Sequence, residues 1–145
     1  MAKMKTVSIE AKNTEKFKVE VKAGSHTLYV DQPVAGGGDD EGPNPIEYFF
    51  TSLAGCIATV ARIIAKQKRI KLNGLDMKIE GDFDTETILG KSKENRAGVT
   101  GIHVTLSIDA DMTSEEKNAF VEEIESRCPV SDNIACVTPV KIEII

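Results

Sequence analysis

The residues of this sequence that are best suited to nucleophilic or redox chemistry are its three cysteines, Cys56, Cys128 and Cys136. The reactive form of cysteine is the thiolate, which burial among apolar groups disfavours. Cys56 lies in an apolar stretch and could equally be a small buried hydrophobic residue. Cys136 stands between Ala135 and Val137, and we expect it to be a buried structural thiol. Spacing alone leaves open whether Cys56 and Cys128 react as a pair.

The number and spacing of the cysteines argue against two other uses. Three is an odd number, which does not suit the disulfide framework of a secreted protein. The intervals from Cys56 to Cys128 and from Cys128 to Cys136 fit no common zinc pattern, and the chain has two histidines. We therefore expect no metal site.

Cys56 falls near the middle of the longest apolar stretch, residues 44–69, which predicts a helix. Asn44 is a good N-cap, Pro45 suits the first helical position, and Glu47 completes a capping-box spacing. Apolar residues on nearly every side of this helix predict that it is buried in a core. A membrane span is the alternative, but charges such as Glu47 and Arg62 interrupt the stretch. We expect a core helix and no membrane partner.

Three strands are predicted before this helix, because apolar and polar residues alternate over residues 6–11, 17–21 and 26–30. Short turns separate them, which indicates an antiparallel meander. Residues 31–43 follow, with four glycines, two prolines and four acidic residues. They form either a flexible lid or a plain linker. The acidic residues Asp39, Asp40 and Glu41 disfavour phosphate binding by the glycines.

After the helix, alternation predicts a strand over residues 75–83, with a bulge or bend at Gly81. An irregular hairpin loop, residues 84–101, leads to a second strand over 102–108, which places His103 on a polar, exposed face. A capping box at Thr113 and Glu116 starts a helix that ends where Pro129 follows Cys128.

The remainder of the chain is expected to form a short helical turn that reaches Cys136, with Ser131 or Asp132 as its cap, and a last strand over 140–144. This order of elements is α+β, and 145 residues suit a single domain, 1–145. A net charge of −5 argues against a nucleic-acid partner. No signal-peptide pattern begins the chain, so a cytoplasmic location is expected.

Two segments resemble one known family. Residues Asn44 to Cys56, NPIEYFFTSLAGC, resemble the first-cysteine helix of the OsmC/Ohr family, and Arg127-Cys-Pro-Val-Ser131 resembles its second-cysteine motif. The order of elements is similar over essentially the whole chain. The resemblance implies an OsmC-like fold: N-terminal antiparallel strands, a long buried central helix, a second strand pair and helix, and an intertwined homodimer.

The resemblance also implies a reaction. Members of the family are small thiol peroxidases that reduce organic hydroperoxides, so Cys56 would be the peroxidatic residue and Cys128 the resolving one. A dithiol would be the reductant, a lipoyl protein in the best-known branch of the family. Neither a metal nor a bound cofactor would be needed.

This sequence departs from the family pattern near the expected thiolate. In the family's peroxidases an arginine of the N-terminal sheet stabilises it, held by a glutamate directly after the helix-starting proline. Here no arginine precedes Arg62, Ile46 follows Pro45, and the acid comes one place later, at Glu47. At about 100° per residue, Glu47 and Cys56 lie on opposite helix faces, so we expect a cap rather than a catalytic acid. The cations that could replace the arginine are Lys16, Lys18, Lys22, His26 and Arg127.

Three functions are therefore compared. The first is a thiol peroxidase that uses Cys56 and Cys128. The second is an OsmC-like binder of a small hydrophobic or thiol ligand, with little or no turnover. The third is hydrolytic or acyl chemistry on the same two thiols, which ranks last because no Ser-His-acid set stands out.

Overall fold

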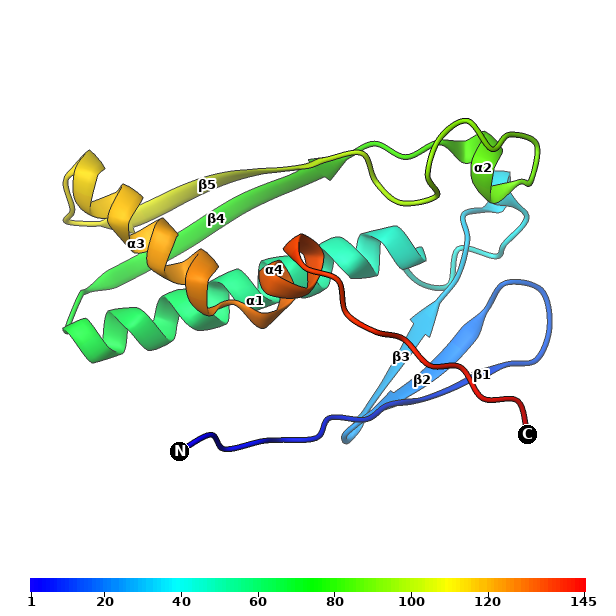
Figure 1. The fold of residues 1–145 in the computed structure, drawn as a ribbon, viewed down its shortest axis with the longest axis horizontal. Coiled ribbons are helices and arrows are strands. Elements are labelled where there is room, and N and C mark those ends of the chain that lie inside the picture. Colours follow the sequence, from blue (N-terminus) through cyan, green and yellow to red (C-terminus); the bar gives the residue numbers. More distant parts are fainter. The chain divides into compact units, whose positions relative to one another are not determined.

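The structure is a computed structural model that describes residues 1–145, and it is α+β, as the sequence predicts. It divides into two compact units, Met1–Thr51 and Ser52–Ile145, which are described separately below. The elements in chain order (Figure 1) are β1 (Glu10–Asn13), β2 (Val19–Ala23), β3 (His26–Val30), a 3-10 turn η1 (Val34–Gly36), α1 (Pro45–Lys68), β4 (Leu72–Gly81), α2 (Thr85–Ile88), β5 (Ile102–Ala110), α3 (Ser114–Arg127) and α4 (Pro129–Ala135).

The first unit contains the predicted meander, in the order β1-β2-β3 with antiparallel pairing. Glu10 is opposite Lys22, and Val19 is opposite Val30. The first strand begins later than the alternation predicts, because residues 6–9 are outside it. Val7 and Ile9 are exposed, so the expected half-buried face is absent within one chain.

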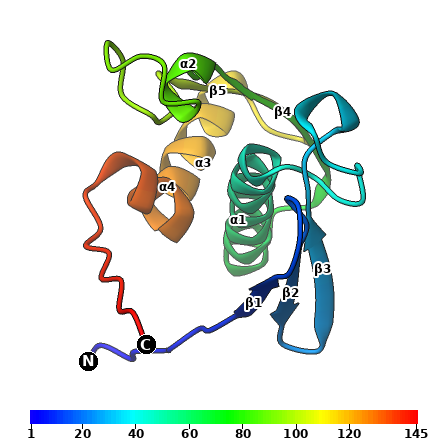
Figure 2. The same ribbon diagram turned by 90° about the vertical axis from the view of Figure 1, so that its right-hand side faces the viewer.

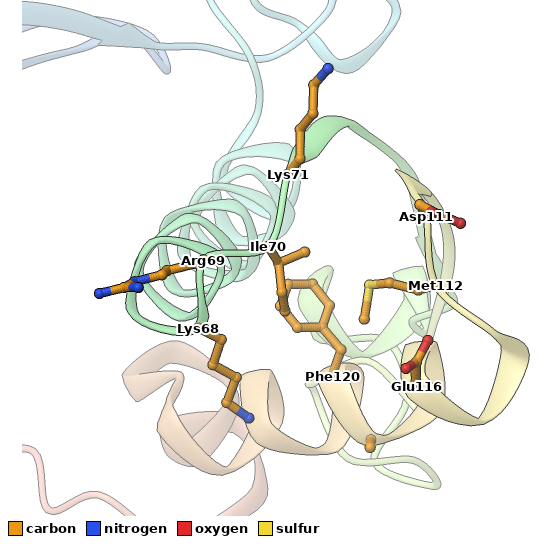
Figure 3. Close-up of a pocket in the computed structure, with 9 residues that line it drawn as sticks. Lys68, Arg69, Ile70, Lys71, Asp111, Met112, Glu116 and Phe120 are labelled. Atoms are coloured by element: carbon orange, nitrogen blue, oxygen red, sulfur yellow. The ribbon is translucent and has the colours of Figure 1, made fainter.

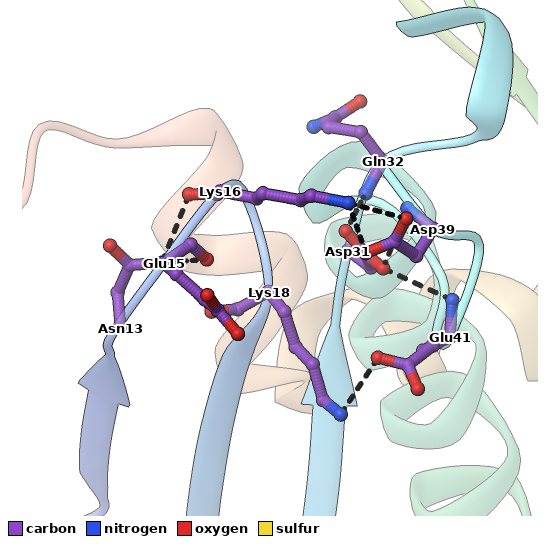
Figure 4. A network of polar contacts seen from close by, with 8 residues as sticks. All are labelled: Asn13, Glu15, Lys16, Lys18, Asp31, Gln32, Asp39 and Glu41. Carbon is purple, nitrogen blue, oxygen red and sulfur yellow. Dashed lines mark hydrogen bonds and ion pairs between the residues drawn. The ribbon is translucent and has the colours of Figure 1, made fainter. Parts of the chain in front are cut away.

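The loop after β3 is ordered by a buried carboxylate (Figure 4), which neither a flexible lid nor a plain linker would require. Asp31 accepts hydrogen bonds from the backbone N–H groups of Gln32, Asp39 and Glu41, at 2.8, 3.2 and 3.1 Å. Glycine is required where the backbone turns back on itself, since a Cβ at Gly38 would lie 2.0 Å from the Gln32 carbonyl oxygen. These contacts fold residues 31–41 around one side chain.

Helix α1 begins with the predicted capping box. The Asn44 N–H donates to Glu47 Oε2 at 2.8 Å, and the Glu47 N–H donates to Asn44 Oδ1 at 2.9 Å. The expected burial on all sides is wrong for the single chain, because one face is buried and Ile63 on another is exposed. By length and composition α1 could also cross a membrane, a test that the core helix of a soluble protein passes as well. The buried face consists of Leu53, Ile57, Val60, Ala61, Ile64 and Ala65.

In the second unit, β4 and β5 form the predicted antiparallel hairpin. The irregularity lies between Leu72 and Gly74 and not at the predicted Gly81, which pairs regularly with Ile102. The intervening segment contains one helix that the sequence did not predict, α2. The side chain of its N-cap, Asp84, accepts a hydrogen bond from the Glu86 N–H. His103 is exposed, as predicted.

Helix α3 has the predicted capping box between Thr113 and Glu116. The short helix that follows begins earlier than expected: its N-cap is Cys128, and Pro129 occupies its first turn instead of only ending α3. Proline is well suited to the first helical turn, where its missing N–H has no intrahelical partner. The predicted last strand is wrong for the single chain, since residues 137–145 form an extended tail with no strand pairing (Figure 1).

In the second unit, the helices pack on the β4–β5 hairpin through a shared hydrophobic core. Figures 1 and 2 show α1 running along β4 and β5, with α3 beside it. The buried face of α1 forms one core cluster with Leu72 and Ile108 of the hairpin and with Phe120 and Ile124 of α3. Cys128 belongs to the same cluster, and Cys56 packs against it. The core therefore holds the two cysteines that the sequence singled out.

Candidate functional site

Cys56 and Cys128 are 72 positions apart in the sequence, yet they pack in one core cluster, and each thiol shifts the pKa of the other. Cys56 lies on α1, where the helix fixes its position. Cys128 lies between α3 and α4 as the shared cap of both helices. All three cysteines are free thiols. Two neighbouring thiols can form a disulfide, which is the chemistry that this arrangement favours.

Cys128 is the more deeply enclosed of the two, with 1% of its surface exposed. Its sulfur accepts a hydrogen bond from the Ser131 N–H at 3.4 Å. The Ser131 hydroxyl and the Val130 N–H also lower the pKa of the Cys128 thiol. The sequence predicted Ser131 as a possible helix cap. In the structure Cys128 is the N-cap of α4, and Ser131 is the third residue of that helix. Proline directly after Cys128 was the signal that could have shown this.

The two thiols differ in the direction of their pKa shifts. Burial raises the pKa of Cys56, and its hydrogen bond with Cys128 raises it further, while the Val130 N–H lowers it. Burial also works to raise the pKa of Cys128, but hydrogen bonds from Cys56, Ser131 and Val130 outweigh it and lower that pKa below its usual value.

Cys136 is exposed, so the prediction of a buried structural thiol is wrong. It caps the C-terminal end of α4, a helix without a buried residue, and the chain after it is an exposed tail. Its apolar neighbours Ala135 and Val137 are exposed as well. Apolar neighbours in sequence predict burial only where they lie on the packed side of an element, and these two do not. The Cys136 sulfur lies 3.9 Å from Asp132 Oδ1.

Glu47 and two of the cations proposed to replace the family's arginine have partners within the first unit. Glu47 is held by the cap of α1. Lys16 forms an ion pair with Asp39 at 2.8 Å, and Lys18 forms one with Glu41 at 2.7 Å (Figure 4). Both acids belong to the loop around Asp31.

Two further candidate cations also have defined partners. Lys22 bonds Thr27 and Glu20, and Arg127 bonds Gln67 and Glu123. Arg127 is adjacent to Cys128 in sequence, but its guanidinium points to these partners.

An apolar cavity of about 480 Å³ is lined by residues that neighbour Cys56 and Cys128, although neither cysteine lines it. Leu53 and Ile57, on either side of Cys56 in α1, line it, and so does Ser131, which bonds Cys128. Side chains of β5, α3 and α4 complete its wall, with Glu125 as the charged residue among them. A cavity of this size and polarity suits a small molecule with an apolar group.

A second cavity, of about 450 Å³, lies at the C-terminal end of α1. Figure 3 shows Ile70, Met112 and Phe120 facing one another there, while Arg69 and Lys71 point away. Its lining residues include none of those that flank Cys56 in α1 or follow Cys128 in α4. We therefore do not assign it to the thiol site.

Comparison with known proteins places these features in a family. The family profile described as OsmC-like protein matches residues 37–143, a span that includes all three cysteines. No protein with a curated description matches the sequence.

Solved structures of similar fold carry related descriptions. An OsmC-like protein from Mycoplasma pneumoniae is 22% identical, with a TM-score of 0.79 over 92% of this chain and 89% of that one. The organic hydroperoxide resistance protein OsmC from Legionella pneumophila is 22% identical, with a TM-score of 0.69 over 92% and 91%.

A third structure is an organic hydroperoxide resistance protein from Vibrio cholerae with captopril bound in one of its active sites. It is 16% identical, with a TM-score of 0.62 over 92% of this chain and 87% of that one. At these identities the likeness shows a shared fold. With the family profile matching most of its length, the chain belongs to the OsmC-like protein family.

Proposed function

We propose that this protein is a thiol-dependent peroxidase that reduces organic hydroperoxides through Cys56 and Cys128. The observation that carries the proposal is that Cys56 and Cys128 pack in one core cluster, act on each other's pKa, and have neighbours that line an apolar cavity. Two findings support the proposal: the chain belongs to the OsmC-like protein family, and structures of similar fold include an organic hydroperoxide resistance protein.

In the proposed reaction, the Cys56 thiolate attacks one peroxide oxygen and breaks the O–O bond. Cys56 becomes a sulfenic acid, and an alkoxide leaves that takes up a proton to become the alcohol. The Cys128 thiolate then attacks the sulfenic sulfur, which forms the Cys56–Cys128 disulfide and releases hydroxide. A dithiol, for which a lipoyl protein is one candidate, restores both thiols by exchange and is itself oxidised to a disulfide.

The two cysteines should have unequal roles because their surroundings differ. Helix α1 holds Cys56 rigidly, whereas Cys128 lies at a junction between two helices that can adjust. Because the arginine of the family's peroxidases is missing from this sequence, less Cys56 thiolate is expected near pH 7, so we expect a slower reaction than in those enzymes.

The test is consumption of cumene hydroperoxide with a dithiol donor. Cys56→Ser should abolish consumption. Cys128→Ser should consume about one equivalent and then stall, because nothing resolves the sulfenic acid, which dimedone should trap on Cys56. Continued turnover by Cys56→Ser would contradict the assignment.

The second candidate is an OsmC-like binder of a small hydrophobic or thiol ligand, with weak or no catalysis. The cavity of about 480 Å³ and the raised pKa of Cys56 favour it, since the first offers a binding site and the second lowers reactivity. Correctly folded protein that leaves hydroperoxide untouched at every pH would support this candidate over the first.

A further inference from the structure

The apolar cavity of about 480 Å³ is lined by one charged side chain, the carboxylate of Glu125 on α3. All of its lining residues belong to the second unit. Apart from Glu125 they are apolar, with the exception of Ser131, and no lysine, arginine or histidine is among them. A single negative charge therefore sets the electrostatic character of this cavity.

The charge of Glu125 is not neutralised by a partner. Two basic side chains approach the exposed carboxylates of α3, and both bond Glu123: Lys68 from the end of α1 and Arg127 from α3 itself. Glu125 is exposed, and no ion pair holds its carboxylate. Its charge is therefore free to act on a molecule in the cavity.

The walls of the cavity are connected to both cysteines. The residues three positions before and one after Cys56 in α1 line it. Ser131 lines it as well, and its N–H donates to the Cys128 sulfur at 3.4 Å. The Cys128 N–H in turn donates to the carbonyl of Glu125 at 3.4 Å. An organic group bound in the cavity would thus lie against residues that neighbour both thiols.

We propose that Glu125 makes this cavity selective for hydroperoxides whose organic group is neutral or cationic, and against those that carry a carboxylate. The inference rests on the proposed peroxidase function, because it names the class of hydroperoxide that the thiol pair reduces. A carboxylate in the cavity would lose water, would meet no cation, and would be repelled by Glu125. An uncharged aryl or alkyl group would only bury apolar surface there.

The test compares two substrates that differ in one charge: cumene hydroperoxide with a para carboxylate, and the methyl ester of that compound. The unchanged protein should consume the ester with a kcat/KM at least about tenfold higher, since loss of water and repulsion act together on the acid. Glu125→Gln should reduce this ratio at least about threefold, and Glu125→Lys should reduce it further.

Two properties identify the effect as electrostatic and as an effect on binding. The change should appear in KM, because the charge acts on the bound organic group and not on the bond that breaks. Because Glu125 is exposed, about 1 M salt should screen its charge and bring the ratio of the unchanged protein close to that of Glu125→Gln.

Glu122→Lys is the matched control. It makes the same change of net charge as Glu125→Lys, at an exposed position of α3 that does not line the cavity. The ratio should stay that of the unchanged protein, and melting curves should show that all three variants are folded. Equal changes in Glu122→Lys and Glu125→Lys, or no change in Glu125→Lys, would overturn the inference.

Binding of the two product alcohols separates this inference from the proposed function, because alcohols do not oxidise thiols. Their dissociation constants, measured from the NMR shifts of isoleucine methyl groups, should show the same preference and the same dependence on Glu125. If neither hydroperoxide is consumed while the alcohols bind with this preference, the proposed function is overturned and the selectivity of the cavity stands. If both are consumed and the alcohols bind without regard to charge, the inference alone is overturned.

Discussion

At the scale of single residues, the three cysteines have three different surroundings. Cys56 is half-buried on a rigid helix, Cys128 is enclosed among donors, and Cys136 is exposed beside a carboxylate. The sequence singled out the first two by resemblance and could not show how Cys128 is held. The Ser131 N–H reaches the Cys128 sulfur because a helix begins at Cys128.

Cys136→Ser should leave the oxidant-driven Cys56–Cys128 disulfide and the midpoint of urea unfolding unchanged. The reason is its exposure, since surface substitutions away from special features usually have small effects. Non-reducing peptide mapping and a urea titration measure the two quantities. Loss of the disulfide in this variant would mean that Cys136, and not Cys128, resolves.

Glu47→Gln should keep the peroxidase rate and lose at most about 1 kcal/mol of stability, because glutamine also serves in a capping box. The structure gives Glu47 this cap role through its bond to the Asn44 N–H at 2.8 Å. Asn44→Ala is the comparison variant and should lose about 1 kcal/mol by removing the partner acceptor. A large fall in rate at an unchanged melting curve would show instead that the acid is catalytic.

At the scale of elements, the long helix, the meander and the hairpin were predictable because caps and periodicity identify them locally. Two features were not. Helix α2 is a single turn within a polar segment, so its Asp84 cap is weak evidence alone. The tail over 140–144 alternates like a strand, but pairing needs a neighbouring edge that the single chain does not supply.

Asp31→Asn should disorder the loop over residues 31–41 and lower the urea midpoint. An amide cannot accept the three backbone N–H groups as a carboxylate does. Hydrogen exchange of the Asp39 and Glu41 amides should accelerate most. Asp40→Asn is the control, because asparagine tolerates the left-handed backbone at φ 54° there. Equal effects of both changes would remove the central role of Asp31.

The same carboxylate predicts a dependence on pH. The backbone donors lower the pKa of Asp31, although burial opposes them. A lowered pKa in the folded state contributes stability that is present above the unfolded value of about 3.9 and is lost as pH falls through the folded value. The loop should therefore loosen in acid, and Asp31→Asn should remove that part of the pH dependence.

At the scale of the whole molecule, exposed alternating segments at both ends of the chain favour a homodimer. Val140, Ile142 and Ile144 are 83%, 85% and 97% exposed, and Val7 and Ile9 are exposed too. Apolar strand-like segments without partners are suited to pairing with another chain. We expect an intertwined homodimer in which they pair between subunits.

Light scattering at micromolar concentration tests the assembly, and removal of residues 138–145 should weaken the dimer. A stable folded monomer of 15.7 kDa would contradict the dimer. It would leave the chemistry of the thiol pair to be judged separately.

The central claim is that Cys56 and Cys128 form a redox pair, and peptide mapping by mass spectrometry after one equivalent of an organic hydroperoxide tests it most directly. The account predicts a Cys56–Cys128 disulfide in the unchanged protein and a dimedone adduct on Cys56 in Cys128→Ser. Both thiols unmodified in correctly folded protein would contradict the account.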